Sequence, residues 1–315
     1  MDIKYRVIFM GTPEFAVSSL QVLIDHPQTE VVAIITQPDK PIGRSHTPQP
    51  SPVKQLATTH QFPIWTPAKV KNNSELIEQI KSVQPDIIIV SAYGKILPQE
   101  ILDIPKMGII NVHGSLLPKY RGASPIAGSI INGDFFTGIT LMKMVLEMDA
   151  GPIIATSQPI PIESTDTTVT LTQKLSLIGA ELLQQSLLPY LIGQLTPVPQ
   201  DENQATFVPV IKKEDGQINW QEDALTIERK IRAYHPWPST YTFWQDKRLK
   251  IIQGEVLLSG KDIPGKIWVT PDKYPAVFTN QGSLKILKVQ PEGKSVMSGV
   301  DYLRGWPQLI GSILK

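Results

Sequence analysis

The chain has 315 residues, of which 41% are hydrophobic and 19% charged, and its net charge is +1. This composition excludes extended disorder, and the length is enough for two domains. The absence of cysteine excludes disulfides and thiolate catalysis, and no apolar run reaches the roughly 18 residues of a membrane span. No two of the five histidines have metal-ligand spacing, so we expect no metal site.

The first part of the chain alternates between predicted strands and helices. Strands are expected at 5–10, 30–36, 86–92 and 108–113, and helices at 14–25, 53–60 and 74–82. Ile and Val runs separated by helices are typical of strands buried on both faces, which predicts an α/β fold with a doubly wound, mostly parallel, Rossmann-like sheet. Only Gly11 of a G-x-G-x-x-G pattern is present, which argues against a bound dinucleotide.

Residues 37–52 read QPDKPIGRSHTPQPSP, with five prolines and almost no apolar side chains. Connections of this length in a compact sheet are functional or disordered. Lys40, Arg44 and His46 offer cations to a phosphate group, and the alternative is a loop without a partner.

Asn111 and His113 stand two residues apart at the end of a predicted strand, so their side chains share a face. Ligands of parallel sheets bind beyond the carboxyl ends of the strands. An amide donor and a proton-exchanging imidazole are what a carbonyl under nucleophilic attack requires. The alternative is that Asn111 caps a turn and His113 is a hydrogen-bonded loop residue. Asp149, between predicted strands at 138–145 and 153–156, is likewise either a site residue or a turn former.

A helix at 169–192, with a break expected near Pro189, is followed by the prolines of a polar segment. We therefore predict a first domain at 1–193, a linker at 194–209 and a second domain at 210–315. Short alternating runs in the second domain predict a small, antiparallel, OB-like β-barrel.

Charge is divided unevenly along the chain. Residues 1–209 hold 14 basic and 18 acidic side chains, a net charge of −4, whereas residues 210–315 hold 16 and 11, a net charge of +5. Basic residues of the second domain alternate with aromatic ones, which favours a nucleic-acid partner. The alternative is a solvated surface over an aromatic core.

Two groups of motifs carry a family resemblance. The run Asn111-Val112-His113-Gly114-Ser115-Leu116-Leu117-Pro118, with Asp149-Ala150-Gly151 downstream, resembles enzymes that depend on formyltetrahydrofolate. The start GTPEFA, the QPDKPxGR loop followed by SPVK, and IRAYHPWP in the second domain narrow the likeness to the methionyl-tRNA formyltransferase family. The resemblance implies transfer of a formyl group from 10-formyltetrahydrofolate to the α-amino group of methionyl initiator tRNA in translation initiation, by direct amine attack and a tetrahedral intermediate.

The resemblance also implies roles for individual residues. Asn111 and His113 would bind the formyl oxygen, while Asp149 would orient His113 and assist proton transfer. The folate pocket would be lined by the segment before Asp149 and by Ala92, Tyr93, Gly94, Ile96, Leu97, Ser115, Leu116, Leu117 and Pro118. Lys40 and Arg44 would contact the tRNA. Because Ser45 and His46 stand where relatives often have lysines, either Arg44 carries more of the contact or the affinity for tRNA is lower.

Partners and location follow from the same resemblance and from the start of the chain. We expect a monomer without membrane attachment. Because the chain enters a strand at once, neither a secretory signal nor a transit peptide is expected, which favours the cytoplasm of a bacterium.

Two other functions stay open. A formyltetrahydrofolate enzyme with another acceptor, such as a sugar amine, glycinamide ribonucleotide or water, needs neither the basic domain nor the proline-rich loop. A non-catalytic tRNA-binding module does not need the set Asn111, His113 and Asp149.

Overall fold

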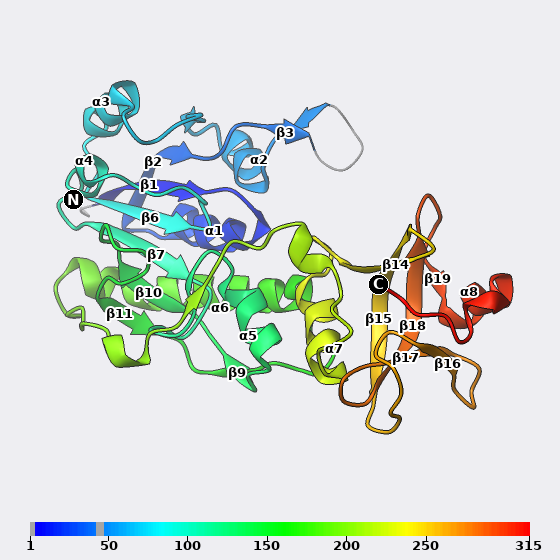
Figure 1. Ribbon diagram of the computed structural model, residues 1–315. Coiled ribbons are helices and arrows are strands. Elements are labelled where there is room, and N and C mark those ends of the chain that lie inside the picture. The colour runs from blue at the N-terminus through cyan, green and yellow to red at the C-terminus, as the bar shows by residue number, and fades with distance from the viewer. Residues whose placement is uncertain (1–3, 42–46) are drawn as a thin grey trace. The chain divides into compact units, whose positions relative to one another are not determined.

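The computed structural model describes residues 4–41 and 47–315 (Figure 1). Contacts divide the chain into two compact units. The first comprises the described parts of 1–125, 136–161 and 172–209, and the second comprises 126–135, 162–171 and 210–315. Each unit is described by itself.

The first unit is built on a seven-stranded sheet with the strand order β11-β10-β7-β6-β1-β2-β5. The five parallel strands are β1 (Tyr5–Gly11), β2 (Thr29–Ile35), β5 (Ile64–Trp65), β6 (Ile87–Ser91) and β7 (Ile109–His113). The edge strands β10 (Thr140–Lys143) and β11 (Ile153–Thr156) run antiparallel to their neighbours. The predicted mostly parallel sheet is therefore confirmed, with an antiparallel edge beside β7.

Helices alternate with these strands; four of the six were predicted, whereas those at 99–102 and 125–132 were not. They are α1 (Val17–Asp25), preceded by a 3-10 turn at Glu14–Ala16, α2 (Pro52–Thr59), α3 (Ser74–Ser82), α4 (Gln99–Leu102), α5 (Pro125–Asn132) and α6 (Thr168–Leu191). Ser51 and Asn73 cap α2 and α3 by accepting hydrogen bonds from Lys54 and Leu76 backbone amides. Ile8 of β1, Ile35 of β2 and Ile88 of β6 are fully buried in a core cluster with residues of α3 and α4.

Pro189 does not break α6, contrary to the prediction. The helix continues to Leu191 and ends where Gly193 adopts a φ of +77°. A proline removes one backbone donor from the helix. Because Pro189 lies in the last turn, the helix ends before a longer distortion develops, and the Pro189 carbonyl accepts hydrogen bonds from the backbone amides of Gln194 and Leu195.

Three two-stranded ribbons complete the first unit. The strands β3 (Lys40–Pro41) and β4 (Pro48–Gln49) pair antiparallel in the proline-rich loop, and residues 42–46 between them lie outside the described residues. The strands β9 (Phe136–Thr137) and β12 (Ile160–Pro161) also pair antiparallel. The strands β8 (Arg121–Gly122) and β13 (Phe207–Val208) pair parallel, which brings the predicted linker onto the loop that follows β7.

The second unit holds a six-stranded antiparallel sheet, as predicted. Its order is β14 (Thr240–Trp244), β15 (Lys247–Leu257), β18 (Ser283–Pro291), β17 (Pro275–Phe278) and β16 (Ile267–Val269), with β19 (Met297–Ser298) beside β18. Most of α5 belongs to this unit, together with α7 (Ala224–Ala233) and α8 (Gly299–Gly305). Backbone hydrogen bonds from Ile267 to Ser312 and between Phe243 and Lys315 connect both outer strands through the last residues of the chain.

Most aromatic residues that alternate with basic ones in the sequence belong to the core of this second unit. Trp220, Tyr234, Tyr241 and Trp244 are buried, whereas Trp237 is 59% exposed. The alternative of an aromatic core is therefore correct for four of these five side chains. In the part of the chain that the structure describes, no helix combines the length and apolar character that crossing a membrane requires.

Candidate active site

The end of β7 places Asn111 and His113 on one face of the sheet. Asn111 is paired with Val90 of β6 and Met142 of β10, and His113 is paired with Thr140. The Asn111 side chain is half-buried and makes no hydrogen bond with any described residue. A half-buried amide without a protein partner is available to a ligand.

His113 is buried, and its ring orientation defines its proton chemistry. Its Nε2 lies 3.0 Å from the Tyr120 carbonyl oxygen, and its Nδ1 lies 3.7 Å from Oδ2 of Asp149. A carbonyl oxygen only accepts, so Nε2 carries the proton of the neutral ring. The Nδ1 atom is then a proton acceptor that faces a carboxylate.

Burial lowers the pKa of His113 below its ordinary value, because the surroundings disfavour the charged ring. The charge of Asp149 and the hydrogen bond to Tyr120 act in the opposite direction and are smaller. His113 is therefore neutral at pH 7 and can take up a proton at Nδ1.

Asp149 is held by its backbone and by its side chain. Its φ is +51°, in the left-handed region that residues other than glycine rarely adopt. The Gly122 backbone N–H donates to Oδ2 at 2.7 Å, and the Gln200 side-chain amide donates to the Asp149 carbonyl at 2.8 Å. Together these bonds direct the carboxylate toward His113.

Gln200 and its neighbours are site residues that the sequence analysis missed. Buried Arg121 forms a bidentate ion pair with Glu202 and donates to the Gln200 side-chain oxygen. The segment from Gln200 to Val208 was predicted as linker because prolines surround it and its residues are polar. No local signal distinguishes such a segment from a solvated connection.

The run Ser115 to Pro118 is fixed to β10. Thr140 Oγ1 donates to the Ser115 carbonyl at 2.8 Å and accepts from the Leu117 backbone N–H at 3.0 Å. Ser115 and Leu117 are buried, whereas Leu116 and Pro118 keep partial exposure. Of these four predicted folate residues, Leu116 and Pro118 therefore offer accessible side-chain surface.

The loop from Ala92 to Leu97 divides in the same way. Tyr93 and Leu97 belong to the buried core cluster, while Ile96 is 72% exposed. Positive φ values of +47° at Ala92 and +74° at Gly94 turn the backbone, so that neighbouring side chains of the loop point alternately into the core and into solvent. Burial also raises the pKa of the Tyr93 hydroxyl to about 12, so Tyr93 supports the loop as a neutral core residue.

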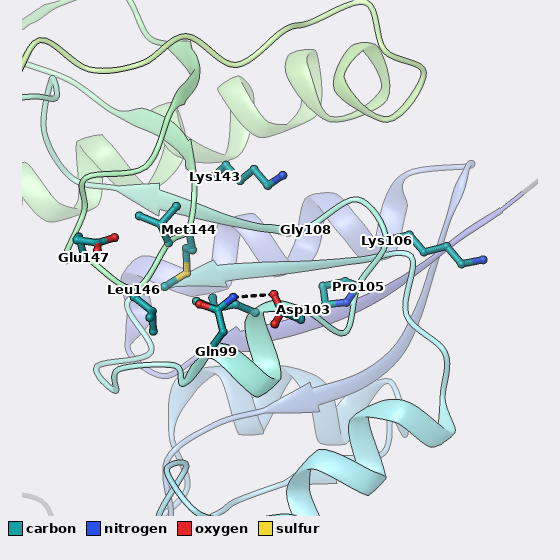
Figure 2. Close-up of a pocket in the computed structure, with 11 residues that line it drawn as sticks. Gln99, Asp103, Pro105, Lys106, Gly108, Lys143, Met144, Leu146 and Glu147 are labelled. Carbon is teal, nitrogen blue, oxygen red and sulfur yellow. Dashed lines mark hydrogen bonds between the residues drawn. The ribbon is translucent and has the colours of Figure 1, made fainter.

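A cavity of about 540 Å³ lies beside the segment that precedes Asp149 (Figure 2). Figure 2 shows Gln99 and Asp103 in its wall, joined by a hydrogen bond of 2.6 Å. The full lining consists of Gln99, Leu102, Asp103, Pro105, Lys106, Gly108, Lys143, Met144, Val145, Leu146 and Glu147. Neither the Ala92–Leu97 loop nor the Ser115–Pro118 run lines this cavity.

Of the two predicted tRNA contacts, only Lys40 lies among the described residues. Its Nζ donates to Gln37 Oε1 at 2.7 Å. Burial lowers the pKa of Lys95, and the charge of Lys40 lowers it further. Arg44 and His46 lie outside the described residues. Within 4–41 and 47–315, no three histidine or acidic side chains gather in a way that could hold a metal ion.

The lowered pKa of His113 predicts a pH-dependent stability. The unfolded chain takes up a proton near pH 6.5, before the folded protein does, so the free energy of unfolding falls as pH drops below about 6.5. The slope attributable to one proton is at most about 1.4 kcal/mol per pH unit. Urea denaturation between pH 8 and 5 should show a shallower pH dependence for His113→Gln than for the wild type. Equal dependence in both proteins would contradict a buried, neutral His113.

Comparison with known proteins identifies the family. Residues 4–187 match the model of the formyl transferase family, and residues 210–307 match its C-terminal domain. The chain is 44% identical over 300 residues to the methionyl-tRNA formyltransferase of Streptococcus pyogenes serotype M2, covering 95% of each protein. It is 42% identical over 311 residues to that of Staphylococcus epidermidis, covering 98% of this chain and 99% of the relative.

Solved structures show the same fold at greater sequence distance. The N-formyltransferase from Helicobacter canadensis, in complex with folinic acid and dTDP-3-aminofucose, matches with a TM-score of 0.66 at 20% identity. The match covers 92% of this chain and 100% of that one. Because both domain models match and the relatives align along nearly their full length, this chain belongs to the methionyl-tRNA formyltransferase family.

Proposed function

We propose that this protein transfers the formyl group of 10-formyltetrahydrofolate to the α-amino group of methionyl initiator tRNA, the step that prepares the initiator for translation. The observation that carries the proposal is the free amide of Asn111 at the end of β7, next to buried His113 and the half-buried carboxylate of Asp149 that faces it. Family membership supports the same chemistry.

The described residues fit a folate. When bound, 10-formyltetrahydrofolate supplies the formyl carbon as the electrophile. We assign the pterin to the Ala92–Leu97 loop, the segment before Asp149 and the run from Ser115 to Pro118, where Leu116 and Pro118 offer accessible side-chain surface. The 540 Å³ cavity lies at the start of β7, beside Gly108, and not at its carboxyl end, so it is not part of this assignment. In the predicted loop, Ala92, Gly94 and Ile96 are the exposed residues that remain candidates for direct contact.

Three side chains divide the chemistry. Asn111 donates to the formyl oxygen as negative charge develops there. His113 accepts the proton of the attacking amine at Nδ1 and returns it to the leaving nitrogen, while the Asp149 carboxylate stabilises the imidazolium. Direct binding of the formyl oxygen by His113, which the family resemblance implies, requires this protonated form, because Tyr120 accepts the proton of the neutral ring.

The tRNA is assigned to the proline-rich loop and the second domain. Lys40 and Arg44 would neutralise phosphates near the acceptor end, and residues 210–315 carry the net charge of +5 that a polyanion favours. The exposed Trp237 offers a stacking surface. We retain 1–193 as the catalytic domain, 194–209 as the connection and 210–315 as the tRNA-binding domain, acting as a monomer in the bacterial cytoplasm.

A formylation assay with four acceptors tests the proposal. Purified protein and 10-formyltetrahydrofolate are expected to formylate methionyl initiator tRNA at least about 100-fold faster than methionyl elongator tRNA, given the 2–3 kcal/mol that a few specific contacts supply. Free methionine and an amino-sugar nucleotide serve as the small acceptors. Equal rates on the two tRNAs, or faster reaction with either small acceptor, would contradict the assignment.

A further inference from the structure

The Gln200 side chain uses all of its hydrogen-bonding groups at the candidate site. Its Nε2 donates to the carbonyls of Asp149 at 2.8 Å and Gly151 at 2.7 Å, and its Oε1 accepts two hydrogen bonds from Arg121. A side-chain amide whose oxygen only accepts and whose nitrogen only donates can meet these four partners in one orientation. Gln200 therefore connects a buried cation to the turn that carries the candidate catalytic carboxylate.

The turn that Gln200 holds has little intrinsic preference for its conformation. Asp149 has a φ of +51°, a backbone conformation that is unfavourable for a residue with a Cβ atom. Gly151 passes so close to β10 that a Cβ atom there would lie 1.7 Å from the Lys143 carbonyl oxygen. A strained backbone persists only where surrounding groups fix it, and Gln200 bonds to both ends of this turn.

The cation behind Gln200 is itself immobilised. Arg121 is 2% exposed, and its bidentate ion pair with Glu202 has N–O distances of 2.7 and 2.8 Å. Two parallel bonds fix the plane of a guanidinium group. The orientation of Arg121 sets the position of the Gln200 oxygen, and the Gln200 nitrogen then sets the position of the turn.

We propose that Gln200 is a positioning residue for formyl transfer, which fixes the turn from Asp149 to Gly151 so that the carboxylate faces Nδ1 of His113. The inference rests on the catalytic role proposed for Asp149. Gln200 lies outside the Asn111, His113 and Asp149 set and acts through the backbone of the turn from Asp149 to Gly151.

Two substitutions distinguish the role of Gln200 in positioning the Asp149 turn from its role as a hydrogen-bond acceptor for Arg121. Gln200→Ala removes both functions of the amide, whereas Gln200→Glu keeps an acceptor for Arg121 but has no donor for the two carbonyls. Both variants are expected to lower kcat about 10- to 100-fold, because small displacements of a reacting group cost rates of this size. KM for tRNA and folate should change less than about three-fold. Gln204→Ala, an exposed glutamine of the same segment, is the matched control and should keep wild-type kcat.

A double-mutant cycle distinguishes the two hypotheses. If Gln200 acts through Asp149, Gln200→Glu should cause less than a three-fold further loss of kcat in an Asp149→Asn background. The acid limb of the kcat profile should also move to lower pH in Gln200→Ala, since a displaced carboxylate no longer supports the His113 imidazolium.

Each outcome gives a decision. Wild-type kcat in Gln200→Glu, or losses that multiply fully with Asp149→Asn, would overturn the positioning role and leave the proposed function standing. An Asp149→Asn variant with normal kcat would instead refute the proposed catalytic role. Circular dichroism and the denaturation midpoint show whether Gln200→Ala folds. If it does not fold, the kcat of Gln200→Glu and its double-mutant cycle with Asp149→Asn decide between the same alternatives.

Discussion

Replacement of Asp149 by asparagine is expected to lower kcat about 10²- to 10⁴-fold, the range for loss of a group that assists proton transfer. Asparagine has almost the same shape and keeps an oxygen for the Gly122 N–H, so the turn should survive. It has no charge to stabilise a proton on Nδ1 of His113, which lies 3.7 Å from the carboxylate. Single-turnover formylation with saturating tRNA and folate measures the loss.

The dissociation constant for tRNA is the discriminating measurement for this variant. We expect it to change less than two-fold, because Asp149 is 14% exposed and carries none of the basic surface. Asp25→Asn, at the exposed end of α1, is the control for loss of a carboxylate. A variant with weakened tRNA binding and normal single-turnover rate would assign Asp149 to binding and remove it from the chemistry.

Gly122→Ala is expected to destabilise the protein by about 3 kcal/mol and to reduce kcat at least ten-fold. Gly122 has a φ of +117°, and a Cβ atom there would lie 2.2 Å from the Val208 carbonyl oxygen. Relief of that clash must separate β8 from β13 and move the N–H that holds Asp149. Urea denaturation and steady-state kinetics measure the two effects.

Gly193→Ala provides a matched control for the backbone contribution. Gly193 also has a positive φ, of +77°, but no heavy atom lies within 4 Å of an added Cβ atom. Its substitution should cost about 1 kcal/mol and leave kcat unchanged. If Gly122→Ala were no more destabilising than Gly193→Ala, the close approach of β8 to β13 would not contribute to stability.

The main sheet and its helices could be predicted because their signals are local. Continuous apolar runs give β1, β2 and β6, and Ser51 before Pro52 marks the start of α2. The two-residue spacing of Asn111 and His113 likewise places both side chains on one face of β7. These features depend on residues a few positions apart in the chain.

The remaining features depend on residues that are distant in sequence. Nothing near Gln200 indicates that its amide binds the carbonyl of Asp149, about fifty positions earlier. The direction of Ile96 depends on left-handed backbone at Ala92 and Gly94, which a sequence pattern of this kind does not encode. The basic and aromatic pattern of the second domain was ambiguous, because Trp220 and Trp244 satisfy an apolar core as well as a nucleic-acid surface.

The parallel pairing of β13 with β8 also affects how the gene could be cut and joined. A fragment that ends at residue 193 contains Asn111, His113 and Asp149, yet it lacks Gln200 and the strand that holds Gly122. In chimeras that exchange tRNA-binding domains between relatives, the junction therefore belongs after Val208. The segment from Gln200 to Val208 should be inherited with the catalytic half.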